Sequence, residues 1–258
     1  VETALELGKV LLKVGQHQRA LAWLEEALET HPGEAQLLQA QARLWEAKGE
    51  IARAGMAYRR VLSLNPSSLE AAASVATSHF YDGQPEVALK FFRRLLQGGH
   101  QSPELWNNLG LSALHASQVD LAIPCFQRAL QLASDGPQVA DVWFNLGHLG
   151  IAVGDLGLAY QAFRVAVATD AAHGEALSNL AVLDLRKGNL QAARAGFHAA
   201  MRAAPHLYEP PYNAALLAYK LGDLEEAHAL VQKAILAYPH HYDSKQLLRK
   251  LQNHFALS

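Results

Sequence analysis

Small and large apolar residues recur along the chain in a pattern that repeats every 34 residues. In frames that begin at Val1, position 20 is always alanine, position 8 is glycine or alanine, and position 24 is a larger apolar or aromatic residue. Positions 20 and 24 lie one helical turn apart and therefore share a helix face. The pattern predicts paired helices, with small residues placed where the two helices pack closely. The alanines are Ala20, Ala54, Ala88, Ala122, Ala159, Ala193 and Ala227, and the frame slips once, by three residues, near 134–137.

Turn-forming residues divide each frame into two halves. A glycine just past a helix end adopts the left-handed conformation without the steric cost of a Cβ atom. Position 15 is therefore expected to end the first helix, and proline at position 32 to mark the end of the second. We expect Gly98-Gly99 and Gly136-Pro137 to act likewise in frames that lack this proline. Position 15 holds Gly15, Gly49, Gly83, Ser117, Gly154, Gly188 and Gly222, and position 32 holds Pro32, Pro66, Pro205 and Pro239.

These positions resemble the tetratricopeptide-repeat family, whose consensus has Trp at position 4, Leu-Gly at 7 and 8, Ala at 20, Phe at 24 and Pro at 32. Residues 106–110 and 143–147 match it especially closely. The resemblance covers residues 1–241 and implies an all-α fold, a right-handed superhelical solenoid of seven helix-turn-helix repeats. The repeats are expected at 1–34, 35–68, 69–102, 103–139, 140–173, 174–207 and 208–241. Residues 242–258 are expected to form a capping helix, with Leu247, Leu248, Leu251 and Phe255 on one face.

The first helix of each repeat lines a groove in this family, and four consecutive repeats place asparagine at position 6 of that helix. A carboxamide both donates and accepts hydrogen bonds, so a row of them suits the main chain of an extended peptide. The alternative interpretation is that the asparagines brace neighbouring repeats. Groove binding predicts that Asn145→Ala with Asn179→Ala weakens partner binding and barely changes thermal stability. The candidate groove residues are Asn108, Asn145, Asn179, Asn213, Leu111, Phe144, His148, Val182, Tyr212 and Leu216.

Composition narrows the function further. The chain has 22 basic and 24 acidic side chains, whereas nucleic-acid binders usually carry a basic excess, so no nucleic-acid partner is expected. Its single cysteine, Cys125, cannot form an intrachain disulfide, which fits a reducing, cytoplasmic compartment. No apolar run is long enough to span a membrane, so any membrane association is expected to be indirect. The opening Val1-Glu2-Thr3 lacks an initiator Met, and we interpret it as a start inside a longer protein.

No group of residues predicts catalysis, and we expect neither a metal nor a cofactor. His240, His241 and Asp243 lie together at a repeat exit, an exposed context that favours adventitious metal binding at most. Cys125 has no histidine near it in the sequence, so we interpret it as a buried apolar residue and not as a nucleophile. Every repeated glycine is explained by a helix turn, which leaves no phosphate-binding loop. No frame has lysine at position 5, so the carboxylate clamp of related co-chaperones is excluded as well.

The C-terminal half resembles a narrower family, the tetratricopeptide subunit of the BBSome that is numbered eight among the Bardet–Biedl proteins. The resemblance rests on residues 140–148, 179–183, 186–188, 204–210, 220–224 and 254–257, which include the non-consensus run Pro-His-Leu-Tyr-Glu-Pro at 205–210. It implies a hetero-oligomeric scaffold that moves membrane proteins into and out of cilia with the intraflagellar transport machinery. It also implies other BBSome subunits as partners, with a small extended subunit threaded through the groove. The implied location is the cytoplasm, cilium, basal body and ciliary membrane.

Two other functions are compatible with the sequence. A soluble peptide receptor or cargo adaptor outside the BBSome would bind a short peptide alone and reversibly. The repeat arm of a sugar-transferring enzyme also uses rows of asparagines. That arm needs a catalytic domain after the repeats, whereas the capping helix is expected to end this chain.

Overall fold

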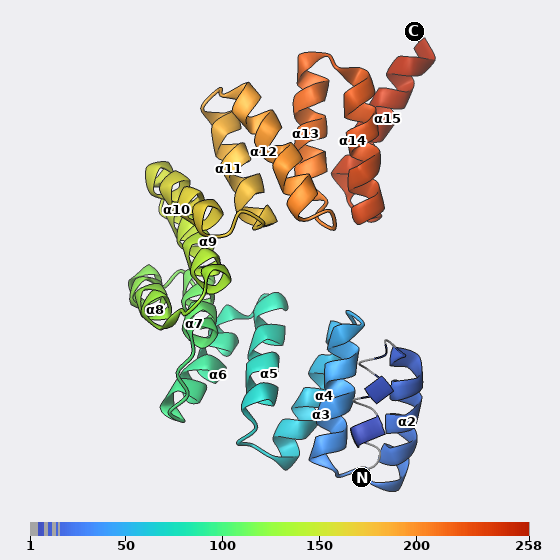
Figure 1. Ribbon diagram of the computed structural model, residues 1–258, viewed down its shortest axis with the longest axis vertical. Helices are drawn as coiled ribbons and strands as arrows, with labels where there is room; N and C mark the ends of the chain where they lie inside the picture. The colour runs from blue at the N-terminus through green and yellow to red at the C-terminus, as the bar shows by residue number, and fades with distance from the viewer. Residues whose placement is uncertain (1–4, 8–9, 12–13, 15, 258) are drawn as a thin grey trace. The chain divides into compact units, whose positions relative to one another are not determined.

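The computed structural model describes residues 5–7, 10–11, 14 and 16–257, and every regular element among them is a helix (Figure 1). This confirms the predicted all-α class. Three residues of the predicted pattern, Gly8, Gly15 and Ser258, lie outside the described residues. The chain divides into two compact units, Val1–Gln131 and Leu132–Ser258, and each is described by itself.

Short turns join consecutive helices in both units. In the first unit, the helices with full bounds are α2 (His17–Thr30), α3 (Ala35–Ala47), α4 (Ile51–Leu64), α5 (Leu69–Tyr81), α6 (Pro85–Gln97), α7 (Pro103–His115) and α8 (Val119–Leu132). In the second unit they are α9 (Gly136–Ala152), α10 (Leu156–Thr169), α11 (Gly174–Arg186), α12 (Leu190–Ala203), α13 (Glu209–Leu221), α14 (Leu224–Ala237) and α15 (Tyr242–Leu257).

Small residues on facing helices let the helix pairs pack closely, and in two repeats a glycine lies directly against a phenylalanine ring. All seven position-20 alanines are buried, at most 2% exposed. A Cβ atom added to Gly147 would lie 2.4 Å from the ring of Phe163, and one added to Gly110 would lie 2.8 Å from the ring of Phe126. Position 8 therefore makes room for the ring at position 24 of the same repeat. The two backbones also lie close together one turn later, where a Cβ atom on Gly150 would lie 2.6 Å from the backbone nitrogen of Ala159.

The turn between the two helices of a repeat uses the left-handed conformation, as predicted. The position-15 glycines from Gly49 to Gly222 have φ between +73° and +84°. Ser117 takes the same conformation, with φ of +58°, and among the described residues it is the single non-glycine with positive φ. The turn geometry is therefore kept even where the sequence lacks the residue that favours it. Gly98 is the C-cap residue of α6, and Gly99 after it has the left-handed conformation, with φ of +86°. Both observations agree with their predicted role at a helix end.

The three-residue slip in the frame lengthens one first helix. We expected Gly136-Pro137 to end a helix, but these residues begin α9, four residues before the predicted repeat boundary at 140. The reason is local: the Asp135 side chain accepts a hydrogen bond from the backbone nitrogen of Gln138, and Pro137 fits the first turn, where its missing N–H is not needed.

The last helix covers the final repeat. Leu247 and Leu251 of α15 are buried in one cluster with Leu230 and Val231 of α14, and Leu248 packs against the same cluster. The predicted capping role is therefore confirmed for these leucines. Phe255 differs from the prediction: it is 42% exposed, and its ring lies against His228.

We predict that Gly147→Ala lowers the free energy of unfolding by about 1–3 kcal/mol, because the new methyl group overlaps the fully buried Phe163 ring. Urea denaturation of both proteins measures the difference. The control is Gly157→Ala, an exposed position of α10 where a Cβ atom meets only the Asp155 carboxylate, at 3.2 Å. Gly157→Ala should raise the free energy of unfolding, by no more than about 1 kcal/mol. Equal destabilisation by both variants would contradict the packing described above.

Candidate functional site

The predicted groove residues all lie on first helices of the repeats. Asn108 and Leu111 are on α7 in the first unit. The second unit carries the others, on α9, α11 and α13: Phe144, Asn145, His148, Asn179, Val182, Tyr212, Asn213 and Leu216. All of these residues are half-buried except Asn145, which is only 7% exposed.

The four asparagines differ in their interactions. Asn145 is buried and has an interaction partner within the protein. The amide nitrogen of Asn179 on α11 lies 3.3 Å from Nε2 of His148 on α9, so it donates to the unprotonated ring nitrogen across the boundary between two repeats. Asn108 and Asn213 make no side-chain hydrogen bond with any other described residue. Asn179 therefore braces two neighbouring repeats, whereas the carboxamides of Asn108 and Asn213 are half-exposed.

Histidines at position 34 hold the aromatic residues of this face. The Phe144 ring lies 4.9 Å from the ring of His173, and the Tyr212 ring lies 4.8 Å from the ring of His241, measured between centroids. Each histidine also caps the next first helix, because its Nδ1 lies 3.3 Å from the backbone nitrogen of Ala176 or Ser244. The aromatic side chains are therefore packed against fixed rings. His241 is a helix cap, not the free loop residue that the sequence indicated.

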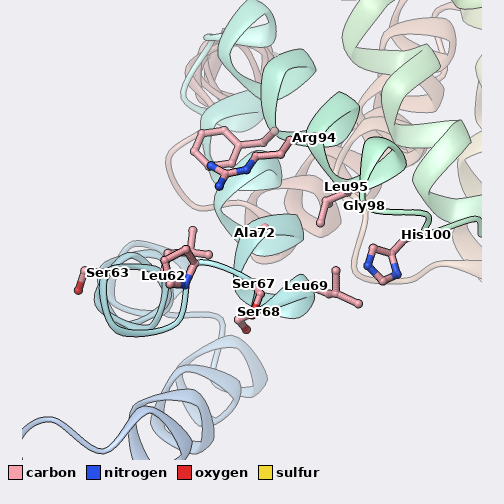
Figure 2. Close-up of a pocket in the computed structure, with 12 residues that line it drawn as sticks. Leu62, Ser63, Ser67, Ser68, Leu69, Ala72, Arg94, Leu95, Gly98 and His100 are labelled. Carbon is pink, nitrogen blue, oxygen red and sulfur yellow. The ribbon is translucent and has the colours of Figure 1, made fainter.

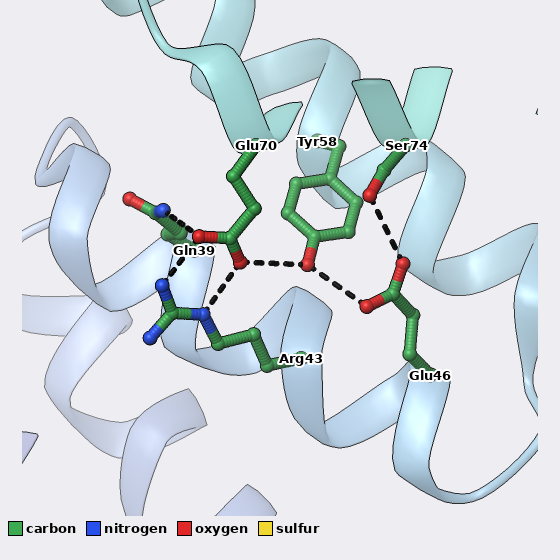
Figure 3. Close-up of polar contacts among 6 residues, drawn as sticks. All are labelled: Gln39, Arg43, Glu46, Tyr58, Glu70 and Ser74. Carbon is green, nitrogen blue, oxygen red and sulfur yellow. Dashed lines mark hydrogen bonds and ion pairs between the residues drawn. The ribbon is translucent and has the colours of Figure 1, made fainter. Parts of the chain in front are cut away.

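A polar network occupies the same face in the first unit (Figure 3). The Arg43 guanidinium on α3 donates two hydrogen bonds to the Glu70 carboxylate on α5. The Tyr58 hydroxyl on α4 lies 3.0 Å from Glu46 Oε2 and 3.1 Å from Glu70 Oε1. Ser74 donates to the other oxygen of Glu46, at 3.1 Å. One tyrosine therefore joins two carboxylates that stand on neighbouring first helices.

The network fixes the charge of its members. The hydrogen bond from Arg43, against the opposing effect of burial, lowers the pKa of Glu70. Burial and the two nearby carboxylates strongly raise the pKa of Tyr58, so the phenol stays neutral and remains a donor. Sequence reasoning missed this cluster. The available signal was a tyrosine at position 24, where most repeats have phenylalanine, together with charged residues at positions 9 and 12 of one repeat and 2 of the next.

A cavity of about 610 Å³ adjoins the network in the first unit. Glu46 and Tyr58 are among the residues that line it, as are Ser74 and Tyr81 of α5. Position 6 in these two repeats is Ala40 and Ser74, not asparagine. The first-helix face thus offers carboxylate and hydroxyl groups here, and carboxamide and aromatic groups in the second unit.

The remaining candidate chemistry is accounted for by structure. Cys125 is 1% exposed, and burial raises the pKa of its thiol to about 11, which confirms the apolar interpretation. Among the described residues no group of three or more His, Cys, Asp or Glu side chains is arranged to hold a metal ion. None of the described helices has the length and apolar character needed to cross a membrane.

The sequence profile of the tetratricopeptide-repeat family matches residues 5–68, 76–137 and 117–173, more than half of the chain. The chain is a tetratricopeptide-repeat protein. Tetratricopeptide repeat protein 8 of Mus musculus is 43% identical over 183 residues, which cover 71% of this chain and 36% of the relative. The BBSome complex member BBS4 of Bos taurus is 26% identical over 180 residues, 70% of this chain and 34% of the relative.

A solved structure of a tetratricopeptide repeat protein from Parabacteroides merdae agrees with the fold. It superposes with a TM-score of 0.78 at 16% identity, over 97% of this tetratricopeptide-repeat chain and 98% of the solved one. At this identity the likeness concerns the fold alone. The chain spans about a third of the length of the curated relatives it matches.

The Glu70 pKa gives a prediction for acid stability. Because the folded state lowers this pKa below its ordinary value of 4.5, the ion pair stabilises the tetratricopeptide-repeat protein above that pH. The contribution is lost as the pH falls through the folded-state pKa. The melting temperature of the wild type should therefore exceed that of Glu70→Gln at pH 7, and the gap should narrow below about pH 4.5. Glu29→Gln, an exposed change on α2, should show no such convergence.

The burial of Asn145 changes the expectation for the asparagine variants. Asn145→Ala should lower the free energy of unfolding by about 1–3 kcal/mol, because it removes a buried, satisfied polar side chain. Asn213→Ala should change it by less than about 0.5 kcal/mol, because that carboxamide is half-exposed and bonds to no described residue. Thermal and urea unfolding of the two variants test this. Equal stability of the two variants would show that the buried Asn145 side chain does not contribute to the free energy of unfolding.

Proposed function

We propose that this chain is a non-catalytic protein–protein interaction scaffold and acts as a BBSome subunit in ciliary membrane-protein trafficking. The observation that carries the proposal is the 43% identity to the mouse relative over 183 residues. Similarity to a second relative, one whose name places it in the BBSome, supports the same complex. The mechanism is assembly by surface complementarity, because stacked repeats expose a long row of side chains without a reaction centre.

The proposed partners are other BBSome subunits, including a small extended subunit that lies along the first-helix face. Asn213 can pair with the main chain of such a segment, and Tyr212, Leu216 and Val182 supply half-buried apolar surface beside it. His148 holds the Asn179 carboxamide at 3.3 Å, which orders this part of the face before a ligand binds. In this proposal the chain is part of a hetero-oligomer, and that complex brings it to the cilium, basal body and ciliary membrane.

A chimeric protein tests the complex. In ciliated mouse cells that lack their own Tetratricopeptide repeat protein 8, the aligned 183 residues of the mouse protein are replaced by those of this chain, and the tagged product is isolated. Quantitative mass spectrometry should recover the other BBSome subunits at the level seen with the mouse protein. Recovery of a single class of peptide-bearing cargo, without the other subunits, would instead support the soluble receptor.

The same chimera tests the groove. Asn213→Ala should lower recovery of the small extended subunit about three- to tenfold, the effect of one lost hydrogen bond, while the large subunits stay bound. Asn189→Ala, an exposed asparagine in the turn between α11 and α12, serves as the control and should leave recovery unchanged. Unchanged recovery with Asn213→Ala would remove the groove from the proposal and leave the scaffold.

A further inference from the structure

Two cavities occupy equivalent places in the two units, away from the first-helix face. One, of about 620 Å³, lies between α4, α5 and α6 in the first unit (Figure 2). The other, of about 560 Å³, lies between α12, α13 and α14 in the second unit. Both are lined by the proline at position 32 and by a cation at position 26, which is Arg94 in the first and Lys233 in the second. None of the positions assigned to the groove lines either cavity.

Both cavities lie beside a position-4 residue that differs from the leucine or tryptophan found there in the other described repeats. Leu38 is fully buried at this position, and Trp106, Trp143 and Leu177 are half-buried there. Trp143 packs against the buried Ala140, Ala166 and Ala176. The two cavities occur in the two described repeats that have neither leucine nor tryptophan at position 4. These repeats carry Ala72 and Pro211 instead, and both residues line the cavities.

The space beside Ala72 therefore has the place and surroundings of a large side chain that this repeat does not supply. Leu62 of α4, Leu69 of α5 and Phe91 of α6 form apolar walls around it. The Arg94 side chain lies at the edge and is exposed (Figure 2). An aromatic side chain from another molecule would bury its ring against these walls as Trp106 and Trp143 bury theirs within this chain.

Charge indicates the chemistry of the segment that would deliver such a side chain. The two second helices that flank the cavity carry Arg53, Arg59, Arg60, Lys90, Arg93 and Arg94, and their single acidic residue is Glu86. This is a local excess of positive charge in a chain whose formal net charge is -2. The equivalent helices of the second unit, α12 and α14, carry Arg194, Arg202 and Lys233 against Glu225 and Glu226, so the first unit has the stronger attraction for acidic groups.

We propose that the cavity between α4, α5 and α6 is a docking site for an acidic segment of a partner protein that inserts one tryptophan or phenylalanine side chain. The ring occupies the space left by Ala72. A flanking carboxylate of the segment pairs with Arg94 at the edge of the cavity, and the net positive charge of α4 and α6 attracts the rest of the segment. This surface is separate from the first-helix groove, so the chain can hold two partners through different faces.

A labelled peptide with one central tryptophan between glutamates is the probe, and fluorescence anisotropy with the whole chain measures its affinity. Ala72→Trp fills the cavity from inside and should lower the affinity at least about tenfold, with a melting temperature unchanged or raised. Arg94→Glu is an exposed change that should weaken binding several-fold and reduce its salt dependence. The matched control is Arg128→Glu, the same charge change at the same repeat position, where Trp106 already occupies position 4. It should leave the affinity within about twofold.

Peptides provide the second arm of the test. Replacing the peptide tryptophan by alanine, or its glutamates by lysines, should abolish binding to the wild type. Wild-type affinity in Ala72→Trp would overturn the proposal, and so would an equal loss in Arg94→Glu and Arg128→Glu, which would indicate diffuse charge attraction without a pocket. If Ala72→Trp lowers the melting temperature, the comparison of Arg94→Glu with Arg128→Glu and of the two peptides decides the question. Asn213→Ala should have no effect, which separates this site from the groove.

Discussion

The contact between a small residue on the first helix and the large residue at position 24 of the second, an aromatic ring in five of the seven repeats, organises the repeat. At Gly147 and Gly110 there is no room for even a methyl group, because the rings of Phe163 and Phe126 occupy that space. Such a contact fixes both the separation and the rotation of two helices, since a shift in either opens a void or creates an overlap. The first-helix face borders this contact, because the rings of Phe144 at position 5 and His148 at position 9 lie 5.8 Å and 5.7 Å from the same Phe163 ring.

The two units use that face differently. In the second unit, amide and aromatic side chains are ordered by histidines, and Asn213 is left with hydrogen-bonding capacity. In the first unit, charged side chains of α3 and α5 pair with each other around Tyr58. A single groove chemistry therefore does not describe the whole chain. A partner segment with a polar main chain and apolar side chains matches the second unit, whereas the first unit presents its basic surface on the second helices.

The periodic part of the structure could be predicted from the sequence, because it depends on residue size and turn conformation at fixed positions. The alanines at position 20, the left-handed turns and the leucines of α15 all occur as predicted. The start of α9 could not be predicted in the same way, since an Asp cap and a first-turn proline turned a stop signal into a start signal. The contacts that individual side chains make could not be predicted from the repeat pattern either. Asn145 and Asn213 occupy the same repeat position, yet one is buried and one is half-exposed, because their neighbours differ.

Tyr58 connects the interior of the first unit with its surface. Its ring is completely buried in the core of the repeat, while its hydroxyl meets two carboxylates on the first-helix face. Phenylalanine would fit the core equally well but would leave Glu46 and Glu70 facing each other without the shared donor. Residues 46, 58 and 70 are therefore expected to change together among related sequences. A lineage that changes the tyrosine to phenylalanine is expected to lose or replace at least one of the two glutamates as well, and such paired changes among relatives would record the network in sequence alone.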